Sequence, residues 1–138
     1  MTLTPKLPDM EVLALDLLNH YMPGEAAYVV TPQADWSKAM PFVWVVRVGG
    51  TTVSPVVDHA ILSVTVIAAQ RKQASDLSRR VLESFYRASM DSFFSDEGVV
   101  SSFEVIKSPQ PDRDGLTGKH PGSFNFDATY DLWARART

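Results

Sequence analysis

The sequence contains no cysteine among its 138 residues. This absence excludes a disulfide framework, a cysteine nucleophile and a thiolate metal site, and it fits a chain made in a reducing cytoplasm. Long apolar runs are also missing, since no stretch approaches the roughly 20 apolar residues that a membrane-spanning helix needs. The N-terminal segment lacks a signal-peptide pattern. We therefore expect a soluble, unexported protein without a membrane partner.

The sequence also lacks a strong charge of either sign. It has 13 basic and 16 acidic residues, for a net charge of −3, which gives no field that would draw in nucleic acid. Hydrophobic residues make up 45% and charged residues 21%, as in an ordinary globular protein. The length fits one domain, residues 1–138, and specific DNA binding is not expected.

Motifs for catalysis or metal binding are scarce. His20, His59 and His120 do not have the spacing of a helical zinc site, and neither a G-x-S-x-G elbow nor a P-loop occurs. Asp112, Asp114 and Asp127 could gather around a divalent cation, but a solvated loop and strand face is the more common use of such residues. We predict no catalytic, cofactor-binding or metal site, and we expect no enzyme activity.

The apolar pattern predicts an α/β (α+β) fold with a single mixed, mostly antiparallel sheet of about four to five strands and two packed helices. Asp9 is the expected N-cap of the first helix, and Pro23-Gly24 its end. The second helix starts near Arg71. The strands are expected at Ala26–Thr31, Phe42–Val48, His59–Ala69, Val99–Lys107 and Phe124–Arg135.

Apolar periodicity assigns a face to most of these elements. In the second helix the buried face is predicted to hold Ala74, Leu77, Val81, Phe85 and Ala88, with Arg79, Arg80, Glu83 and Arg87 outside. The last strand alternates strictly, so one of its faces should be buried. Phe42–Val48 does not alternate, and we expect cover on both of its faces.

Two segments are predicted to project from the sheet. Gly49-Gly50 should form a tight turn after Phe42–Val48, and residues 51–58 should continue as an extended arm at a sheet edge, because Pro55 cannot donate to a central ladder. Residues 108–122 hold three prolines and three glycines without periodicity and are predicted to form a long loop. Loops of this length are usually functional or disordered.

The order of these pieces resembles the tail terminator proteins of long-tailed (siphovirus-type) bacteriophages. The resemblance spans about residues 11–135 and is carried by "YVVTP", "PFVWVVRVGG", "DHAILSVTVIAAQRKQASDLSRRVLESFYRA", "SPQPD" and "FNFDATYDLWARA". It implies a structural virion protein that caps the tail tube, ends its polymerisation and forms the tail side of the head-tail joint. It also implies a location at the head-proximal end of the tail after assembly in the host cytoplasm.

The implied partners are copies of the same chain in a hexameric ring, the tail tube protein and a head-tail connector protein, while DNA passes through the lumen without specific binding. A ring needs heterologous contacts, which sheet edges, arms and loops supply. Trp36 and Arg47 are candidates for such contacts, although a tryptophan that covers the core and an arginine at a solvated strand end explain them equally simply. The full candidate set is Trp36, Arg47, Gly49, Gly50, Asp112, Arg113, Asp114 and Lys119.

Two alternative functions stay open from the sequence. A different head-tail connector or minor tail protein of similar fold would share most of these features. A small α+β enzyme, with an acid/base site built from His59 or the carboxylates of the 108–122 segment, is the alternative from another class.

Overall fold

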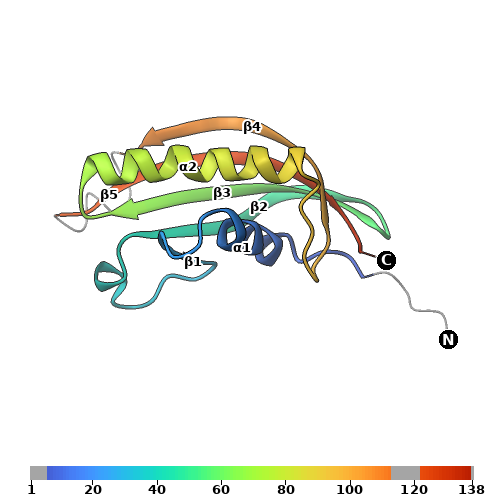
Figure 1. The fold of residues 1–138 in the computed structure, drawn as a ribbon, viewed down its shortest axis with the longest axis horizontal. Helices are drawn as coiled ribbons and strands as arrows, with labels where there is room; N and C mark the ends of the chain where they lie inside the picture. The colour runs from blue at the N-terminus through green and yellow to red at the C-terminus, as the bar shows by residue number, and fades with distance from the viewer. Residues whose placement is uncertain (1–5, 113–121, 138) are drawn as a thin grey trace.

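The computed structural model describes residues 6–112 and 122–137 (Figure 1). It has two α-helices and a five-stranded mixed sheet, which confirms the predicted fold class. Neither helix in these ranges has the length and apolar character to cross a membrane. The elements are α1 (Met10–Tyr21), β1 (Ala27–Val29), the 3-10 helix η1 (Trp36–Lys38), β2 (Phe42–Ser54), β3 (Val57–Ala68), α2 (Arg71–Met90), β4 (Val99–Pro111) and β5 (Phe124–Arg135).

The strand order across the sheet is β1-β2-β3-β5-β4. Only the β1–β2 pair is parallel, and β2–β3, β3–β5 and β4–β5 are antiparallel. Both helices share one hydrophobic core with the same set of strand residues, so they lie on one face of the sheet (Figure 1). We call this the covered face and the opposite side the open face.

The two helices form where the sequence predicts them. The Asp9 carboxylate accepts a hydrogen bond of 3.2 Å from the backbone N–H of Val12, which satisfies one of the free donors at the start of α1. On α2 the five predicted apolar residues are all buried, and its four predicted outer residues are all exposed. An amphipathic helix of this kind gains its stability from burying one face against the sheet.

The core lies between the helices and the covered face. Its strand residues on β3 and β5 alternate with side chains that point to the open face, as the sequence predicts for β5. At its centre the rings of Phe85, Phe103 and Tyr130 pack together, with all three centroid separations between 5.2 and 5.3 Å. Aromatic packing at these separations adds to the burial energy of the rings.

The predicted turn at Gly49-Gly50 is wrong. β2 runs on to Ser54, and the turn lies at Pro55 and Val56, so that β2 and β3 form one long hairpin. The pairing register instead shifts between Arg47 and Gly49, as at a β-bulge. Gly50 has a φ of 108°, and a Cβ there would lie 2.0 Å from the His59 carbonyl oxygen. These glycines therefore allow a bulge with close strand approach rather than a chain reversal.

The predicted boundary of the long loop is also wrong on its N-terminal side. β4 continues to Pro111, so residues 108–111 are strand, and the Asp112 N–H donates to the Asn125 carbonyl at 3.1 Å. Two register shifts between Val105 and Gln110 let the strand accommodate its prolines at the sheet edge. Residues 113–121, which include Arg113, Asp114, Lys119 and His120, lie outside the described residues.

The expectation that β2 is covered on both faces is wrong over most of its length. The helices cover Val43 and Val45, whereas Trp44 and Val46 are half-buried and Val48 is exposed on the open face. Only the start of the strand has cover there, because Trp36 contacts Phe42 with a ring separation of 6.2 Å. The prediction took these apolar side chains as a sign that both faces of β2 are covered. The structure leaves them on an uncovered face, so their apolar character must have another cause.

Candidate subunit interface

Arg47 holds together the base of the β2–β3 hairpin. Its Nη1 donates to Asp58 Oδ2 at 2.6 Å and its Nη2 donates to Asp58 Oδ1 at 3.0 Å, which is a two-point arginine–carboxylate pair. The guanidinium also donates to the carbonyls of Gly49 (3.1 Å) and His59 (3.2 Å). The side chain of Asp58 is only 4% exposed and that of Arg47 32% exposed. The hairpin base is therefore fixed within the chain by a largely buried ion pair.

The hydrogen bonds from Arg47 hold the pKa of Asp58 below its usual value, against the opposing effect of burial. Thr52 Oγ1 also donates to Asp58 at 3.4 Å, which ties the carboxylate to the distal half of β2. Asp58 thus stays ionised at neutral pH and keeps the two strands in register around the bulge.

The outer edge of β2 is paired in the first part of the strand and unpaired in the second. β1 pairs with Phe42–Trp44, and the Arg47 N–H donates to Glu11 Oε2 on α1 at 2.9 Å. Beyond this point, among the described residues, no backbone hydrogen bond covers the outer edge of residues 49–54. Thr51, Thr52 and Val53 are exposed, and Val53 retains 53% of its accessible surface. The hairpin therefore offers a free strand edge.

β4 forms the opposite edge of the sheet. In the part of the chain that the structure describes, it pairs with β5 on one side, and on its other side the loop after α2 covers only its start, where Val100 N–H donates to the Phe93 carbonyl at 2.8 Å. From Ser101 onward most residues are exposed, and Ile106 is 55% exposed. The sheet thus ends in a second free edge, on the side opposite to the hairpin edge.

The open face carries a row of half-buried side chains. The ring of Trp133 stacks on His59 at 4.4 Å with an interplanar angle of 13°, and His59 Nε2 contacts the Asp131 carboxylate. Next to them is a shallow hollow of about 200 Å³ with a mainly apolar lining of Trp44, Val46, Val48, Ser63 and Thr65. The histidine and the carboxylate come from different strands and lie on the open face, beside a shallow hollow rather than in an enclosed pocket.

Asp127 and Asp112 lie together at the far end of the open face. Burial raises the pKa of Asp127, and the hydrogen bond and charge of Asp112 act in the same direction, while Thr65 and Lys107 oppose them. The structure brings together two of the three aspartates that the sequence offered as possible cation ligands, and the third, Asp114, lies outside the described residues. Within the described ranges no group of three or more histidine or acidic side chains is placed to hold a metal ion.

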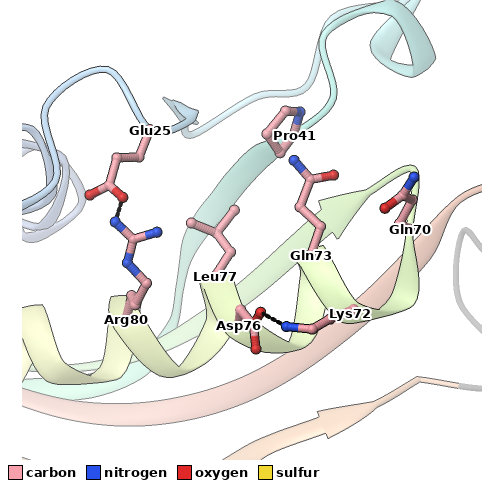
Figure 2. A pocket seen from close by; sticks show the side chains of 8 residues that line it. All are labelled: Glu25, Pro41, Gln70, Lys72, Gln73, Asp76, Leu77 and Arg80. Atoms are coloured by element: carbon pink, nitrogen blue, oxygen red, sulfur yellow. Dashed lines mark hydrogen bonds and ion pairs between the residues drawn. The ribbon is translucent and has the colours of Figure 1, made fainter.

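A charged groove of about 350 Å³ runs between α2 and the start of β2 (Figure 2). Ion pairs hold its walls: Lys72 Nζ donates to Asp76 at 2.8 Å, and Arg80 pairs with Glu25 across the groove. Arg79 contacts Asp76 as well. Because both signs of charge are already paired, the groove is suited to contacts with polar protein surface rather than to binding a free anion.

The predicted contact residues are not brought to one place. Trp36 lies in η1 on the segment between β1 and β2, half-buried against Phe42, and lines a cavity of about 30 Å³. Arg47, Gly49 and Gly50 lie together at the hairpin bulge, whereas Asp112 follows β4. Their role between subunits stays a prediction, with the correction that the guanidinium of Arg47 is engaged by Asp58 within the chain.

Sequence reasoning missed Asp58 and Glu11, the partners of Arg47. A turn at Pro55 would have predicted the hairpin but not this contact, because Asp58 lies opposite Thr52 and Arg47 opposite Leu62, and the guanidinium reaches Asp58 along the strands. No signal in the sequence points to Glu11, because its contact depends on how α1 crosses the sheet.

Comparison with known proteins agrees with this architecture. A model of the family described as phage tail termination protein matches residues 6–110. Among solved structures, a chain in the virion of a native gene transfer agent (GTA) particle is similar in fold, with a TM-score of 0.59 and 12% sequence identity over 91% of this chain and 94% of that chain. Comparison with curated proteins gives no match. Since the family match spans well over half of the sequence, the chain belongs to the phage tail termination protein family, a family of structural tail proteins.

Proposed function

We propose that this protein caps the phage tail tube, ends its polymerisation and forms the tail side of the head-tail joint, as a hexameric ring. The observation that carries the proposal is the family match over residues 6–110, on a fold whose sheet ends in two different free edges. Subunits that join through two different surfaces add head to tail, and such addition closes into a ring when the rotation between subunits allows it.

The distribution of charge supports a ring through which DNA slides. The outer surface of α2 carries a cluster of basic groups, and several of these are already engaged: Arg79 with Asp76, Arg80 with Glu25, and Arg87 over the Tyr21 ring at 4.9 Å. The open face carries the carboxylates of Asp127 and Asp131 and the hydroxyls of β3, and its basic groups include Lys107, close to Asp127, and Arg135 at the end of β5. We therefore assign the open face to the lumen and α2 to the outside, because phosphates bind more tightly with every free lysine or arginine offered.

Tube capping is tested by adding the purified protein to the tail tube protein of the same particle while tubes polymerise. We expect tube growth to stop and negative-stain images to show a ring at one end of each tube. Rings that bind an isolated head-tail connector but leave tube growth unchanged would support the alternative, another connector protein. A protein that stays monomeric and leaves tubes uncapped would contradict the proposal.

DNA passage is tested by measuring duplex binding to the assembled ring at low and moderate salt. We expect weak binding that does not depend on α2. The matched variant changes Arg79, Arg80 and Arg87 to serine, and it should bind DNA no differently. Tight, steeply salt-dependent binding that disappears in this variant would place the arginines in the channel and refute the assignment of faces.

A further inference from the structure

The two free edges of the sheet differ in how far they are protected against pairing with another strand. Proteins protect exposed edges with charged residues, prolines or very short strands, because an unpaired edge is a template for another strand. Residues 49–54 of the hairpin, "GGTTVS", have neither a charge nor a proline. An edge that is long, exposed and unprotected is one that a partner strand is expected to cover.

The β4 edge is partly protected along its length, by the charges of Glu104 and Lys107 and by its register shifts, and most strongly in its distal part. Pro109 and Pro111 lack N–H groups and cannot donate to an added strand, but residues 101–108 contain no proline. This stretch is long enough to pair with all of residues 49–54. It also carries the exposed apolar side chain of Ile106, as the hairpin carries Val48, 61% exposed, and Val53.

We propose that the outer edge of the hairpin, residues 49–54 of β2, pairs with the outer edge of β4, residues 101–108, in the next copy of this chain, so that the sheets of neighbouring subunits join. The occupant is a second copy because the two edges lie on opposite sides of the sheet: β4 ends the strand order, and β2 has a free outer edge beyond its pairing with β1, so each copy supplies one edge and receives the other. This inference rests on the proposed ring and specifies how its subunits meet.

The contacts within the chain prepare the hairpin for this role. The Arg47–Asp58 pair and the Thr52 hydroxyl hold the base of the hairpin, and Glu11 covers the last outer N–H before the free stretch. The free edge therefore begins at a fixed point and is held extended in the isolated subunit. A preformed edge loses less conformational entropy on pairing than a flexible arm would.

The absence of native cysteine permits a direct test by crosslinking. One variant carries Val53→Cys, a second carries Ile106→Cys and a third carries both. Each is treated with a bis-maleimide that spans roughly 10 Å, about twice the spacing between paired strands. We expect the double variant to give a ladder of linked oligomers, the mixture of the two single variants to stop at dimers, and each single variant alone to give none. A Lys72→Cys variant, with an exposed position on α2, serves as the unlinked control.

Two further measurements keep the inference separable from the proposed function. Backbone hydrogen exchange at residues 49–54 and 101–108 should slow on assembly, while β5, already paired on both sides, should not change. Val53→Lys with Ile106→Lys should abolish ring formation with an unchanged unfolding midpoint, whereas Met90→Lys, at a 76% exposed position on α2, should leave rings intact.

Rings that form and cap tubes without the Val53–Ile106 crosslink would overturn the edge pairing and leave the proposed function standing. Self-linking of the Val53→Cys variant would also overturn it, since that result requires a two-fold contact. A protein that remains monomeric with tubes present would overturn both.

Discussion

The two faces of the sheet are built by different rules. On the covered face the strand residues that meet the helices are almost entirely apolar and fully buried, and they interlock with α1 and α2. On the open face apolar, hydroxyl and acidic side chains alternate and remain half-buried. The covered face supplies the free energy that folds the subunit. Among the described residues no helix covers the open face, and the sheet edges remain partly unpaired.

The strongest test of this comparison removes one aromatic ring from each face. Phe85→Ala should lower the free energy of unfolding by about 3–5 kcal/mol, because it leaves a cavity between Phe103 and Tyr130. Trp133→Ala, which removes a larger ring from the open face, should cost only about 1–2 kcal/mol through loss of its stack on His59. Urea denaturation of the monomer measures both. Equal losses would show that the open face is part of the folding core.

The next test concerns the Arg47–Asp58 ion pair, whose carboxylate is buried on the covered face. Arg47→Ala should destabilise the monomer by about 2–3 kcal/mol, since it leaves the buried Asp58 carboxylate without its main partner, while the partial exposure of Arg47 moderates the loss. The comparison variant is Asp76→Asn, which breaks the exposed pairs on α2 and should not change the unfolding midpoint measurably.

The Arg47–Asp58 pair makes the stability of the folded protein depend on pH. The pKa of Asp58 is lowered in the folded state, so its contribution is present above the unfolded pKa of about 3.9 and is lost as the pH falls through the lower folded value. Wild-type protein should therefore lose more stability between pH 5 and acid than Asp58→Asn does, by urea titration at each pH. Parallel curves for the two proteins would mean that the pair does not stabilise the fold.

Patterns along the chain explain why the covered face could be predicted and the assembly surfaces could not. The spacing of apolar residues in α2 and β5 predicts which side chains are buried, because these residues face the core of the same subunit. Asp9 predicts the start of α1 because its side chain accepts a hydrogen bond from the first turn. The hairpin was missed because glycine pairs serve both turns and bulges, and only the pairing partner decides between them. The open face was misjudged because an apolar run such as Phe42–Val46 does not by itself show whether a second layer covers both faces of the strand.

A smaller effect is expected at Tyr130, which carries a buried hydroxyl on the covered face. Tyr130 Oη has no hydrogen-bond partner within the described residues, and burial raises the pKa of its phenol. Tyr130→Phe keeps the ring contacts with Phe85 and Phe103 and removes the unpaired group, so it should stabilise the monomer by about 1 kcal/mol. Thermal unfolding followed by near-UV circular dichroism measures this gain. A loss of stability would show that the hydroxyl has a partner, such as a buried water.

The smallest effect is expected on the open face, at Asp127. Burial, the first cause, and the adjacent Asp112 raise the pKa of Asp127, so its protonated form is favoured in the folded state. The stability linked to this group is fully present below the unfolded pKa and is lost as the pH rises through the higher folded value. Asp127→Asn keeps a hydrogen-bonding side chain and removes the charge, and it should stabilise the monomer at pH 7 by less than about 1 kcal/mol. The gain should vanish in acid, where the wild-type carboxyl is protonated.

Asp35→Asn, at an exposed position before η1, is the matched control and should change nothing at either pH. Destabilisation by Asp127→Asn at pH 7 would show that the open face uses this charge within the subunit and does not merely tolerate it.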